Sequence, residues 1–380
     1  MKIRKTHFIL FALLQFCLVV RLPALWIPHI ENDEVIYQTL ADKVSKNPAD
    51  YTLRGTPILK NLPEKNYDQP LFHRPPLFVY FLALFRSLIG KNAGVLLSIL
   101  AGVFTVAALF GIAKELYGER LAWICAVIIS FCPLLLFCST RILIDAPLAF
   151  LVTLTVGILV VALKRKSRLL FSLSGLALGL AVLTKEPGAL AVFPCAYLLF
   201  KDGINKEKGM YLLYFLGCAF IIVLPWYFWF FTVYGTLIPW WAKIFPENIK
   251  MFPFMEMVVN RPWYFYFQNI TLSMPVYAFA WIAMIGGLKK RRLTLELVWA
   301  LSFLIPITLY GVMGQGYQTR YILPAIPALT ILSADLLNTK DELIWALAVF
   351  LLAIGFLTGI LNTFIFRPAD IFPLYYFIHP

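Results

Sequence analysis

Apolar runs of membrane-spanning length recur along this chain of 380 residues, and they constrain its fold more than any other feature. A helix that crosses a bilayer needs about 20 mostly apolar residues. With 61% hydrophobic and only 14% charged residues, the composition does not fit a water-soluble domain. We predict an all-α polytopic membrane protein with eleven spans, at residues 6–27, 93–113, 121–139, 146–163, 169–183, 187–200, 210–233, 270–288, 293–313, 321–337 and 343–366.

The net charge of +13 indicates membrane topology rather than a nucleic-acid partner, because the basic residues stand in short clusters between the apolar runs. The six cysteines lie inside apolar runs and the four histidines are scattered, so neither a disulfide framework nor a zinc motif is predicted. The sequence requires no cofactor, and it leaves a divalent metal open. The first span contains Arg21 and is too long for a signal peptide.

The segment from Pro76 to Gly90 decides the sidedness of everything after it. The segment is apolar but short, and it carries Arg86. If it does not cross the membrane, 17 Lys and Arg residues lie in inner loops that total 34 residues, with the N-terminus in the cytoplasm; if it crosses, 14 of those 17 move outside. Because cytoplasmic loops retain an excess of both residues, we predict a peripheral or re-entrant helix here.

This topology gives one membrane domain, residues 1–366, followed by a short tail at residues 367–380. Residues 28–92 form the first extracytoplasmic loop with its interfacial helices, and residues 234–269 form an aromatic extracytoplasmic loop. Unusual polar residues then gather on the outer face of the membrane.

The first loop opens with Asp33 and Glu34, and the apolar residues Ile36, Leu40 and Val44 follow at four-residue spacing. This spacing predicts an amphipathic helix that lies on the membrane surface. Asn32 or Asp33 caps this helix, where the backbone N–H groups and the helix dipole favour a negative charge. A carboxylate held there stays ionised and is available as a base. The alternative is that both acids are only first-turn helix residues.

Asp145 and Lys185 each interrupt apolar sequence near the outer end of a span. A charge close to hydrocarbon costs about 2.5–3.5 kcal/mol, so such residues usually face a polar cavity or a partner. Asp145 has Arg141 one helical turn before it, and Lys185 precedes Glu186 in a turn between two apolar helices. The alternatives to a binding role are a structural pair of Asp145 with Arg141, or of Lys185 with Glu186 or Asp145.

Two further cations flank apolar helices on the same face. Arg74 lies at the start of the peripheral helix, and Arg320 precedes Tyr321 at the entrance of a span. Arg320 can either reach for the interface or clamp a phosphate with its fork of donors. Weaker candidates for contacts with a sugar or an acceptor are Tyr37, His73, Trp240 and Trp263.

Together these residues place two carboxylates and three cations around one outer-face cavity. Transfer of a group from a phosphate needs a base for the incoming hydroxyl and positive charge for the departing phosphate. Because the outer compartment lacks nucleoside triphosphates as a routine fuel, a lipid-borne phosphate donor is favoured over a nucleotide sugar.

The motifs that carry these residues resemble those of the GT-C class of integral membrane glycosyltransferases, in particular the protein-mannosyltransferase-like branch (family 39) that includes the lipid A aminoarabinose transferases. Each motif is short, but the ordered set is specific. The matching motifs are Asp33-Glu34 with Tyr37, His73-Arg74-Pro75-Pro76-Leu77, Asp145-Ala146-Pro147, Leu183-Thr184-Lys185, Leu224-Pro225-Trp226 and Arg320-Tyr321-Ile322-Leu323-Pro324.

The resemblance implies an inverting glycosyltransferase of the bacterial inner membrane. Such an enzyme moves a sugar from a polyprenyl-phosphate carrier to a hydroxyl of lipid A or lipopolysaccharide, a polysaccharide or a protein on the extracytoplasmic side. Asp33 is then the general base, and Asp145 supports the acceptor or the cations. Glu34 is a further candidate for a catalytic residue. The carrier phosphate is expected at Lys185, Arg320, Arg74 and Tyr321. Some members carry an acidic residue that can bind metal where this chain has His73, so a metal is not carried over.

Two other functions fit parts of the pattern. A transporter or flippase for lipid-linked saccharides also uses a cationic site in an apolar bundle, but it predicts charges near the bilayer midplane and two related halves. A polymerase or ligase of preassembled saccharides shares the outer active face and the lipid phosphate. A purely structural membrane subunit is the least favoured.

Overall fold

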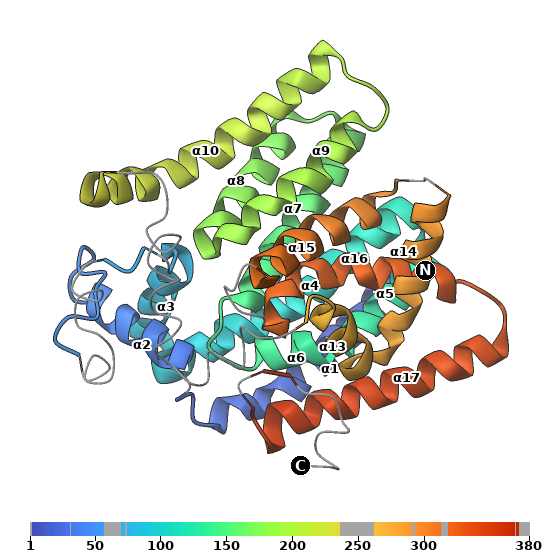
Figure 1. The fold of residues 1–380 in the computed structure, drawn as a ribbon, viewed down its shortest axis with the longest axis horizontal. Helices are drawn as coiled ribbons and strands as arrows, with labels where there is room; N and C mark the ends of the chain where they lie inside the picture. The colour runs from blue at the N-terminus through green and yellow to red at the C-terminus, as the bar shows by residue number, and fades with distance from the viewer. Residues whose placement is uncertain are drawn as a thin grey trace.

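The computed structural model describes residues 2–30, 32–56, 70–72, 74–235, 262–290, 293–312, 318–368 and 370–371. Within these ranges every regular element is a helix (Figure 1), as predicted. The longer helices are α1 (Lys2–Arg21), α2 (Asn32–Val44), α3 (Pro76–Ile89), α4 (Ala93–Tyr117), α5 (Glu119–Ser130), α6 (Pro133–Ser139), α7 (Asp145–Arg165), α8 (Arg168–Thr184), α9 (Val192–Phe200), α10 (Lys206–Tyr234), α13 (Phe265–Ser273), α14 (Ala278–Lys289), α15 (Leu295–Tyr310), α16 (Ile326–Leu337) and α17 (Glu342–Ile360). Short helical turns are η1 (Leu22–Trp26), η4 (Gly90–Asn92), η5 (Glu186–Ala191), η7 (Pro275–Tyr277), η9 (Thr319–Ala325) and η10 (Leu361–Ile365).

Helices occupy all eleven positions at which spans were predicted, but they differ in length. In the described part of the chain, six helical stretches are long and apolar enough to cross a bilayer, and the bent pair α5 and α6 makes a seventh. The six are Thr6–Trp26, Pro76–Tyr117, Asp145–Arg165, Lys206–Tyr234, Thr319–Leu337 and Glu342–Ile365. The remaining helices are shorter apolar segments, so the count of eleven spans stays a prediction.

Proline breaks two of the predicted spans, which is a correction to the sequence-based expectation. The span at 121–139 consists of α5 and α6, which meet at a bend of 58°. Pro133 begins α6, and a proline has no N–H to continue the preceding helix. The span at 270–288 is interrupted in the same way, because α13 ends before Pro275 and η7 separates it from α14.

Small residues let the central helices approach one another closely. Helix α4 packs against α5 and α7, and α8 packs against α7 and α10. Helices α7, α8 and α10 form the green and yellow part of Figure 1. A Cβ added at Gly175 of α8 lies 2.0 Å from the carbonyl oxygen of Phe215 in α10. Contacts of this kind, through glycine, are typical of helix pairs in membranes.

The first loop folds onto one end of this bundle, where Figure 1 shows α2 and α3 below the C-terminal end of α10. The apolar residues predicted for one face of α2 include Leu40 and Val44, and both are buried. The ring of Phe72 lies 4.9 Å from that of Trp229 in α10, centroid to centroid. Helix α3 runs into α4 through Gly90, which has a φ of +76°. The peripheral placement of α3 on the membrane stays a prediction.

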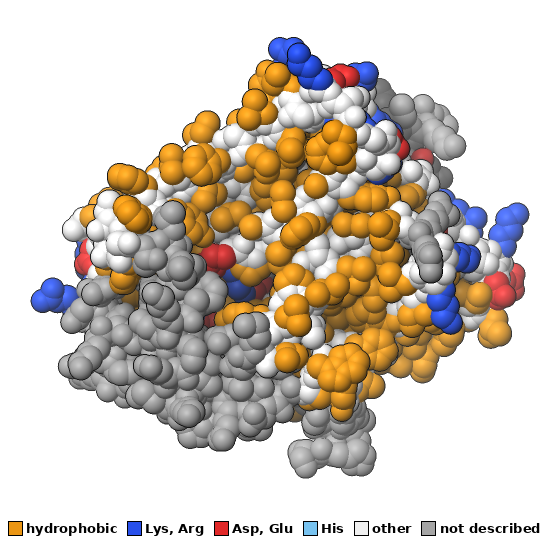
Figure 2. Space-filling view, turned by 45° about the horizontal axis from the view of Figure 1, so that its top comes forward, with side chains coloured by type: hydrophobic (Ala, Val, Ile, Leu, Met, Phe, Trp, Pro, Cys, Tyr) orange, Lys and Arg blue, Asp and Glu red, His pale blue; other side chains and the backbone are white. Residues whose placement is uncertain are grey.

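Apolar side chains also cover much of the outer surface. Large hydrophobic residues are exposed along α10 and α17. Figure 2 shows hydrophobic side chains spread over one face of the molecule, with most Lys and Arg side chains at its margins. A bilayer, not water, is the solvent in which such faces are stable. The chain is an integral membrane protein.

Candidate active site

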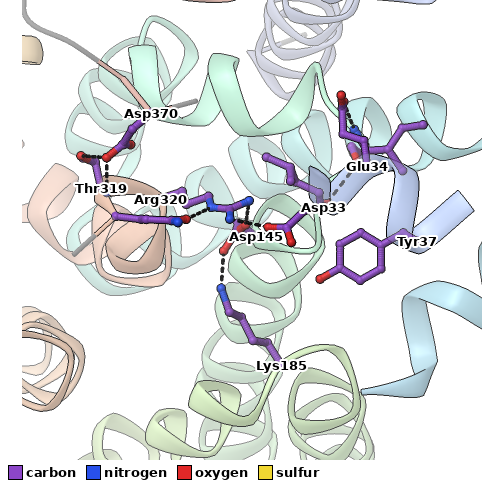
Figure 3. A network of polar contacts seen from close by, with 12 residues as sticks. Asp33, Glu34, Tyr37, Asp145, Lys185, Thr319, Arg320 and Asp370 are labelled. Atoms are coloured by element: carbon purple, nitrogen blue, oxygen red, sulfur yellow. Dashed lines mark hydrogen bonds and ion pairs between the residues drawn. The ribbon is translucent and has the colours of Figure 1, made fainter. Parts of the chain in front are cut away.

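Charged side chains from five separate segments meet at one place in the fold. Figure 3 shows those of Asp33, Asp145, Lys185 and Arg320. Asp33 comes from the first turn of α2 and Asp145 from the first turn of α7. Lys185 stands in the turn between α8 and η5, Arg320 belongs to η9, and Arg74 directly precedes the Pro75-Pro76 start of α3. The structure therefore brings together the five charged residues that the sequence placed on one face of the membrane.

Asp33 is held by two arginines, one on each carboxylate oxygen. Arg74 Nη2 lies 2.5 Å from Oδ1, and Arg320 Nη2 donates to Oδ2. Burial alone would raise the pKa of Asp33, but the charges of Arg74 and Arg320 outweigh burial and hold the pKa far below its usual range. Asp33 is thus ionised, as predicted, and both of its oxygens already have partners.

Asp145 lies between the third cation, Lys185, and Arg320, and its side chain is only 2% exposed. Its Oδ1 accepts a hydrogen bond of 2.7 Å from Lys185 Nζ, which is the structural pair that the sequence left as an alternative. Its Oδ2 lies 3.8 Å from Arg320 Nη1 and has no hydrogen-bond partner among the described residues. Lys185 Nζ also stands 4.3 Å from the ring centroid of Tyr321, so Tyr321 lies within the cluster.

Local backbone chemistry explains why Lys185 leaves its helix at this point. Helix α8 ends at Thr184, Lys185 adopts an extended backbone, and Pro187 restarts the chain as the short helix η5. The turn folds back so closely that a Cβ at Gly188 would lie 2.5 Å from a backbone atom of Ala181. Proline and glycine thus direct the lysine side chain out of the helix and toward Asp145.

Arg74 is fixed by its backbone and by two aromatic residues of the first loop. The Tyr51 hydroxyl donates a hydrogen bond of 2.8 Å to the Arg74 carbonyl. Arg74 Nη1 donates a hydrogen bond of 3.1 Å to the Tyr37 hydroxyl, and its guanidinium lies 5.4 Å from the centroid of that ring. Burial raises the pKa of Tyr37 above its ordinary value, which keeps the phenol neutral. Tyr37 therefore directly contacts Arg74, which is one of the residues expected to bind phosphate.

Glu34 lies beside Asp33 in sequence, yet its carboxylate turns away from the cluster in Figure 3. The residue is fully buried, and its Oε1 accepts a hydrogen bond of 3.0 Å from the backbone N–H of Ile142. His29 Nδ1 is 2.7 Å from the same oxygen. Glu34 thus joins α2 to the loop that leads into α7. The catalytic role expected for Glu34 stays a prediction, and this geometry favours a structural one.

A third carboxylate, Glu186, stands next to Lys185 outside the predicted spans. Burial raises its pKa to about 7, although Lys185 and Arg74 act in the opposite direction. Its charge therefore changes near neutral pH, unlike that of Asp33.

Sequence reasoning missed the residues that hold the start of η9. Asp370, which follows α17, accepts hydrogen bonds from the backbone N–H and the hydroxyl of Thr319. Asn269 of α13 donates to the same hydroxyl. An acidic residue just after the last apolar run was a usable signal for Asp370. Nothing in the sequence pointed from Asn269 to Thr319.

Other predicted residues lie away from the cluster or outside the described ranges. His73 and Trp240 fall outside the described residues. Trp263 is 71% exposed and makes an edge contact with Tyr264, so a sugar-binding role for it stays a prediction. Among the described residues, no three His, Cys, Asp or Glu side chains gather in a way that suits a metal ion.

An apolar groove of about 330 Å³ adjoins the charged cluster. It lies between α3, α8 and α10. Two of its lining residues are close to the cluster in sequence: Pro76 is two positions after Arg74, and Leu183 is two positions before Lys185. The lining residues are Pro76, Leu77, Tyr80, Phe81, Leu183, Ile222, Pro225, Trp226 and Trp229. A charged cluster and an apolar groove are thus formed by neighbouring parts of α3 and of the end of α8.

Comparisons with solved structures identify the fold. The crystal structure of ArnT from Cupriavidus metallidurans bound to undecaprenyl phosphate superposes with a TM-score of 0.67 at 17% identity, covering 93% of this chain and 64% of that one. AglB, an archaeal oligosaccharyltransferase from Archaeoglobus fulgidus in complex with an inhibitory peptide and a dolichol-phosphate, gives a TM-score of 0.55 at 14% identity over 92% of this chain and 54% of that one. The chain has the GT-C fold.

Sequence comparisons show similarity to the branch that the motifs of this chain resemble. The family described as dolichyl-phosphate-mannose-protein mannosyltransferase matches residues 73–229. An uncharacterized protein of Aquifex aeolicus (strain VF5) is 27% identical over 80% of this chain. An undecaprenyl phosphate-alpha-4-amino-4-deoxy-L-arabinose arabinosyl transferase of Pseudomonas paraeruginosa (strain DSM 24068 / PA7) is 26% identical over 69% of this chain. The matches cover 61% and 49% of the lengths of these two relatives.

Proposed function

We propose that this GT-C chain is an inverting glycosyltransferase that takes a sugar from a polyprenyl-phosphate carrier and attaches it to a hydroxyl acceptor. The acceptor is a lipid A or lipopolysaccharide, a polysaccharide or a protein. The reaction takes place on the extracytoplasmic face of the bacterial inner membrane, with the N-terminus in the cytoplasm. The Lys and Arg distribution supports this orientation.

The observation that carries the proposal is the convergence of three cations and two carboxylates from five segments. Arg74, Lys185 and Arg320 offer more positive charge than a structural ion pair needs, and all three side chains keep some exposure. Arginine forks and a lysine ammonium suit a phosphate, which accepts several charge-assisted hydrogen bonds at once. The adjoining apolar groove supports a carrier whose phosphate is attached to an isoprenoid chain.

In the proposed reaction the donor phosphate enters among these cations and takes over hydrogen bonds that Asp33 now receives. Asp33 then accepts the proton of the acceptor hydroxyl, and the hydroxyl oxygen forms a bond to the anomeric carbon of the sugar. The bond between that carbon and the phosphate oxygen breaks, and the electron pair stays on the phosphate. A single displacement inverts the anomeric centre and releases the polyprenyl phosphate.

Asp145 serves a supporting role in this scheme. Its Oδ1 orients Lys185, while its unpaired Oδ2 faces Arg320, so that both cations are held near the departing phosphate. Preorganised charge interactions of this kind are worth about 2.7–4 kcal/mol in the transition state.

The test begins with mass spectrometry of envelope glycans and carrier lipids from cells with and without the chain, which identifies the sugar and the acceptor. The rates at which the purified wild type and Asp33→Asn transfer the sugar from that donor are then compared. We expect transfer to fall at least a hundredfold in Asp33→Asn. The matched control is Asp42→Asn in the same helix, since Asp42 pairs with Arg86 and is more than half exposed. Near-normal transfer by Asp33→Asn rules out the base.

A further inference from the structure

Beyond the last helical turn, η10, Arg367 and Asp370 contact the two segments that carry Asp33 and Arg320. Arg367 Nη1 donates a hydrogen bond of 2.7 Å to the carbonyl of Pro28, in the segment that leads into α2 and Asp33. Asp370 contacts Thr319, the residue directly before Arg320. Arg367 and Asp370 thus touch the chain on both sides of the contact between Asp33 and Arg320.

The contact between Asp370 and Thr319 consists of two hydrogen bonds to one carboxylate oxygen, and it is buried. Asp370 Oδ2 accepts hydrogen bonds of 3.0 Å from the Thr319 backbone N–H and 3.1 Å from the Thr319 hydroxyl. Thr319 is fully buried and Asp370 is 7% exposed. Figure 3 shows this pair at one side of the charged cluster, with Arg320 extending from Thr319 toward Asp33 and Asp145.

The start of η9 has no cap from its own segment, so Asp370 supplies one from a distant part of the chain. Gln318, at the capping position, makes no side-chain capping hydrogen bond, and its Oε1 instead accepts a hydrogen bond of 2.6 Å from Arg320 Nε. The first N–H groups of a helix need acceptors from outside the helix. The Asp370 carboxylate meets that need for Thr319.

Asn269 of α13 completes the junction from a third segment. Its Nδ2 donates to the Thr319 hydroxyl and, at 3.2 Å, to the carbonyl of Ile371. Ser273 Oγ donates to Asn269 Oδ1 at 3.2 Å, which fixes the orientation of the amide. Because Ile371 is itself fully buried, the segment after α17 is anchored on both sides of Asp370.

These contacts fix the backbone from which Arg320 extends. An arginine side chain has many rotamers, so its guanidinium reaches a defined point only if its backbone is held and its head group has partners. We propose that Asp370 is a positioning residue that holds η9 so that Arg320 can bind the phosphate of a polyprenyl-phosphate ligand. This inference rests on the proposed function, because the carrier phosphate is the anion that Arg320 receives.

The experiment measures affinity for undecaprenyl phosphate in nanodiscs and, separately, the position of Arg320 by cryo-electron microscopy. Asp370→Ala removes both hydrogen bonds to Thr319, and we expect affinity to fall about tenfold. In Asp370→Asn the amide oxygen still accepts from the Thr319 N–H, so affinity is expected to stay within about threefold of wild type. The control is Asp341→Ala: Asp341 caps the start of α17 in a comparable way, at 2.9 Å from the N–H of Leu343, but is exposed.

A double variant separates positioning from general destabilisation. Because Asp370 acts through Arg320, the variant Asp370→Ala/Arg320→Gln should bind no more weakly than Arg320→Gln alone, whereas independent effects would add. Additive losses, or equal losses in Asp370→Ala and Asp341→Ala, overturn the inference.

The structural readout distinguishes failure of this inference from failure of the proposed function. If Arg320 stays on Asp33 in Asp370→Ala, the positioning role is wrong whatever the binding shows. If Arg320 moves in that variant while wild type does not bind undecaprenyl phosphate, the carrier in the proposed function is wrong and the positioning of Arg320 by Asp370 stands.

Discussion

Substitution of Glu34 by alanine separates a structural from a catalytic role for the residue next to Asp33. The Glu34 carboxylate is fully buried and accepts hydrogen bonds from the Ile142 N–H at 3.0 Å and from His29 at 2.7 Å. Removing it forfeits a hydrogen bond to a charged group, worth about 1.5–3 kcal/mol, and leaves the buried N–H unpaired at about 1–3 kcal/mol. We expect the free energy of unfolding to fall by about 3–5 kcal/mol in Glu34→Ala.

The assay is equilibrium unfolding in mixed micelles, alongside transfer activity at a temperature where both proteins are folded. Glu34→Gln keeps an acceptor for the Ile142 N–H, so its loss of stability is expected to be about 1–2 kcal/mol. The control is Glu115→Ala, whose partner Lys164 is exposed, and its effect should be below about 1 kcal/mol. If Glu34→Ala unfolds like wild type but loses transfer, the structural reasoning is refuted and Glu34 acts on a substrate.

Three further predictions follow from other contacts. Lys185→Gln removes a cation from the phosphate site and should slow transfer about a hundredfold or more, measured with saturating donor; a rate within threefold of wild type contradicts its role. Burial raises the pKa of Glu186 to about 7, so between about pH 5 and 7 the folded state keeps a proton that the unfolded state has lost. Thermal stability should therefore decline as pH rises from about 5 to 8, and Glu186→Gln should flatten that profile. Gly175→Ala should lower thermal stability, because the added Cβ meets the Phe215 carbonyl. Gly217→Ala is the control and should not lower it, because there is open space around Gly217. Equal stability of the two variants contradicts the close packing of α8 against α10.

The fold was predictable because hydrophobic length and periodicity carry most of the information in a membrane protein. Helices appear at every predicted position, and α2 buries the apolar face that its four-residue spacing indicated. The breaks at Pro133 and Pro275 were not predicted, since proline is common in membrane helices and only neighbouring helices decide whether it interrupts them.

The charged cluster was predictable for a related reason. Charges near hydrocarbon are costly, so Asp145, Lys185 and Arg320 were conspicuous at the ends of apolar runs. The contacts between them depend on how distant segments pack, and the sequence does not encode those contacts locally. Asn269 illustrates the limit: its Asn-Ile-Thr sequence resembles a glycosylation site, whereas its amide is buried against Thr319 and Ile371.

The paired arginines on Asp33 have a kinetic consequence under the proposed function. A carboxylate with a guanidinium on each oxygen has little capacity to take a proton from water or from an acceptor. Only an anion that competes for those guanidinium groups restores that capacity, and the lipid-linked sugar brings this anion with it. Substrates should therefore bind in a compulsory order, with the lipid-linked sugar first and the acceptor second.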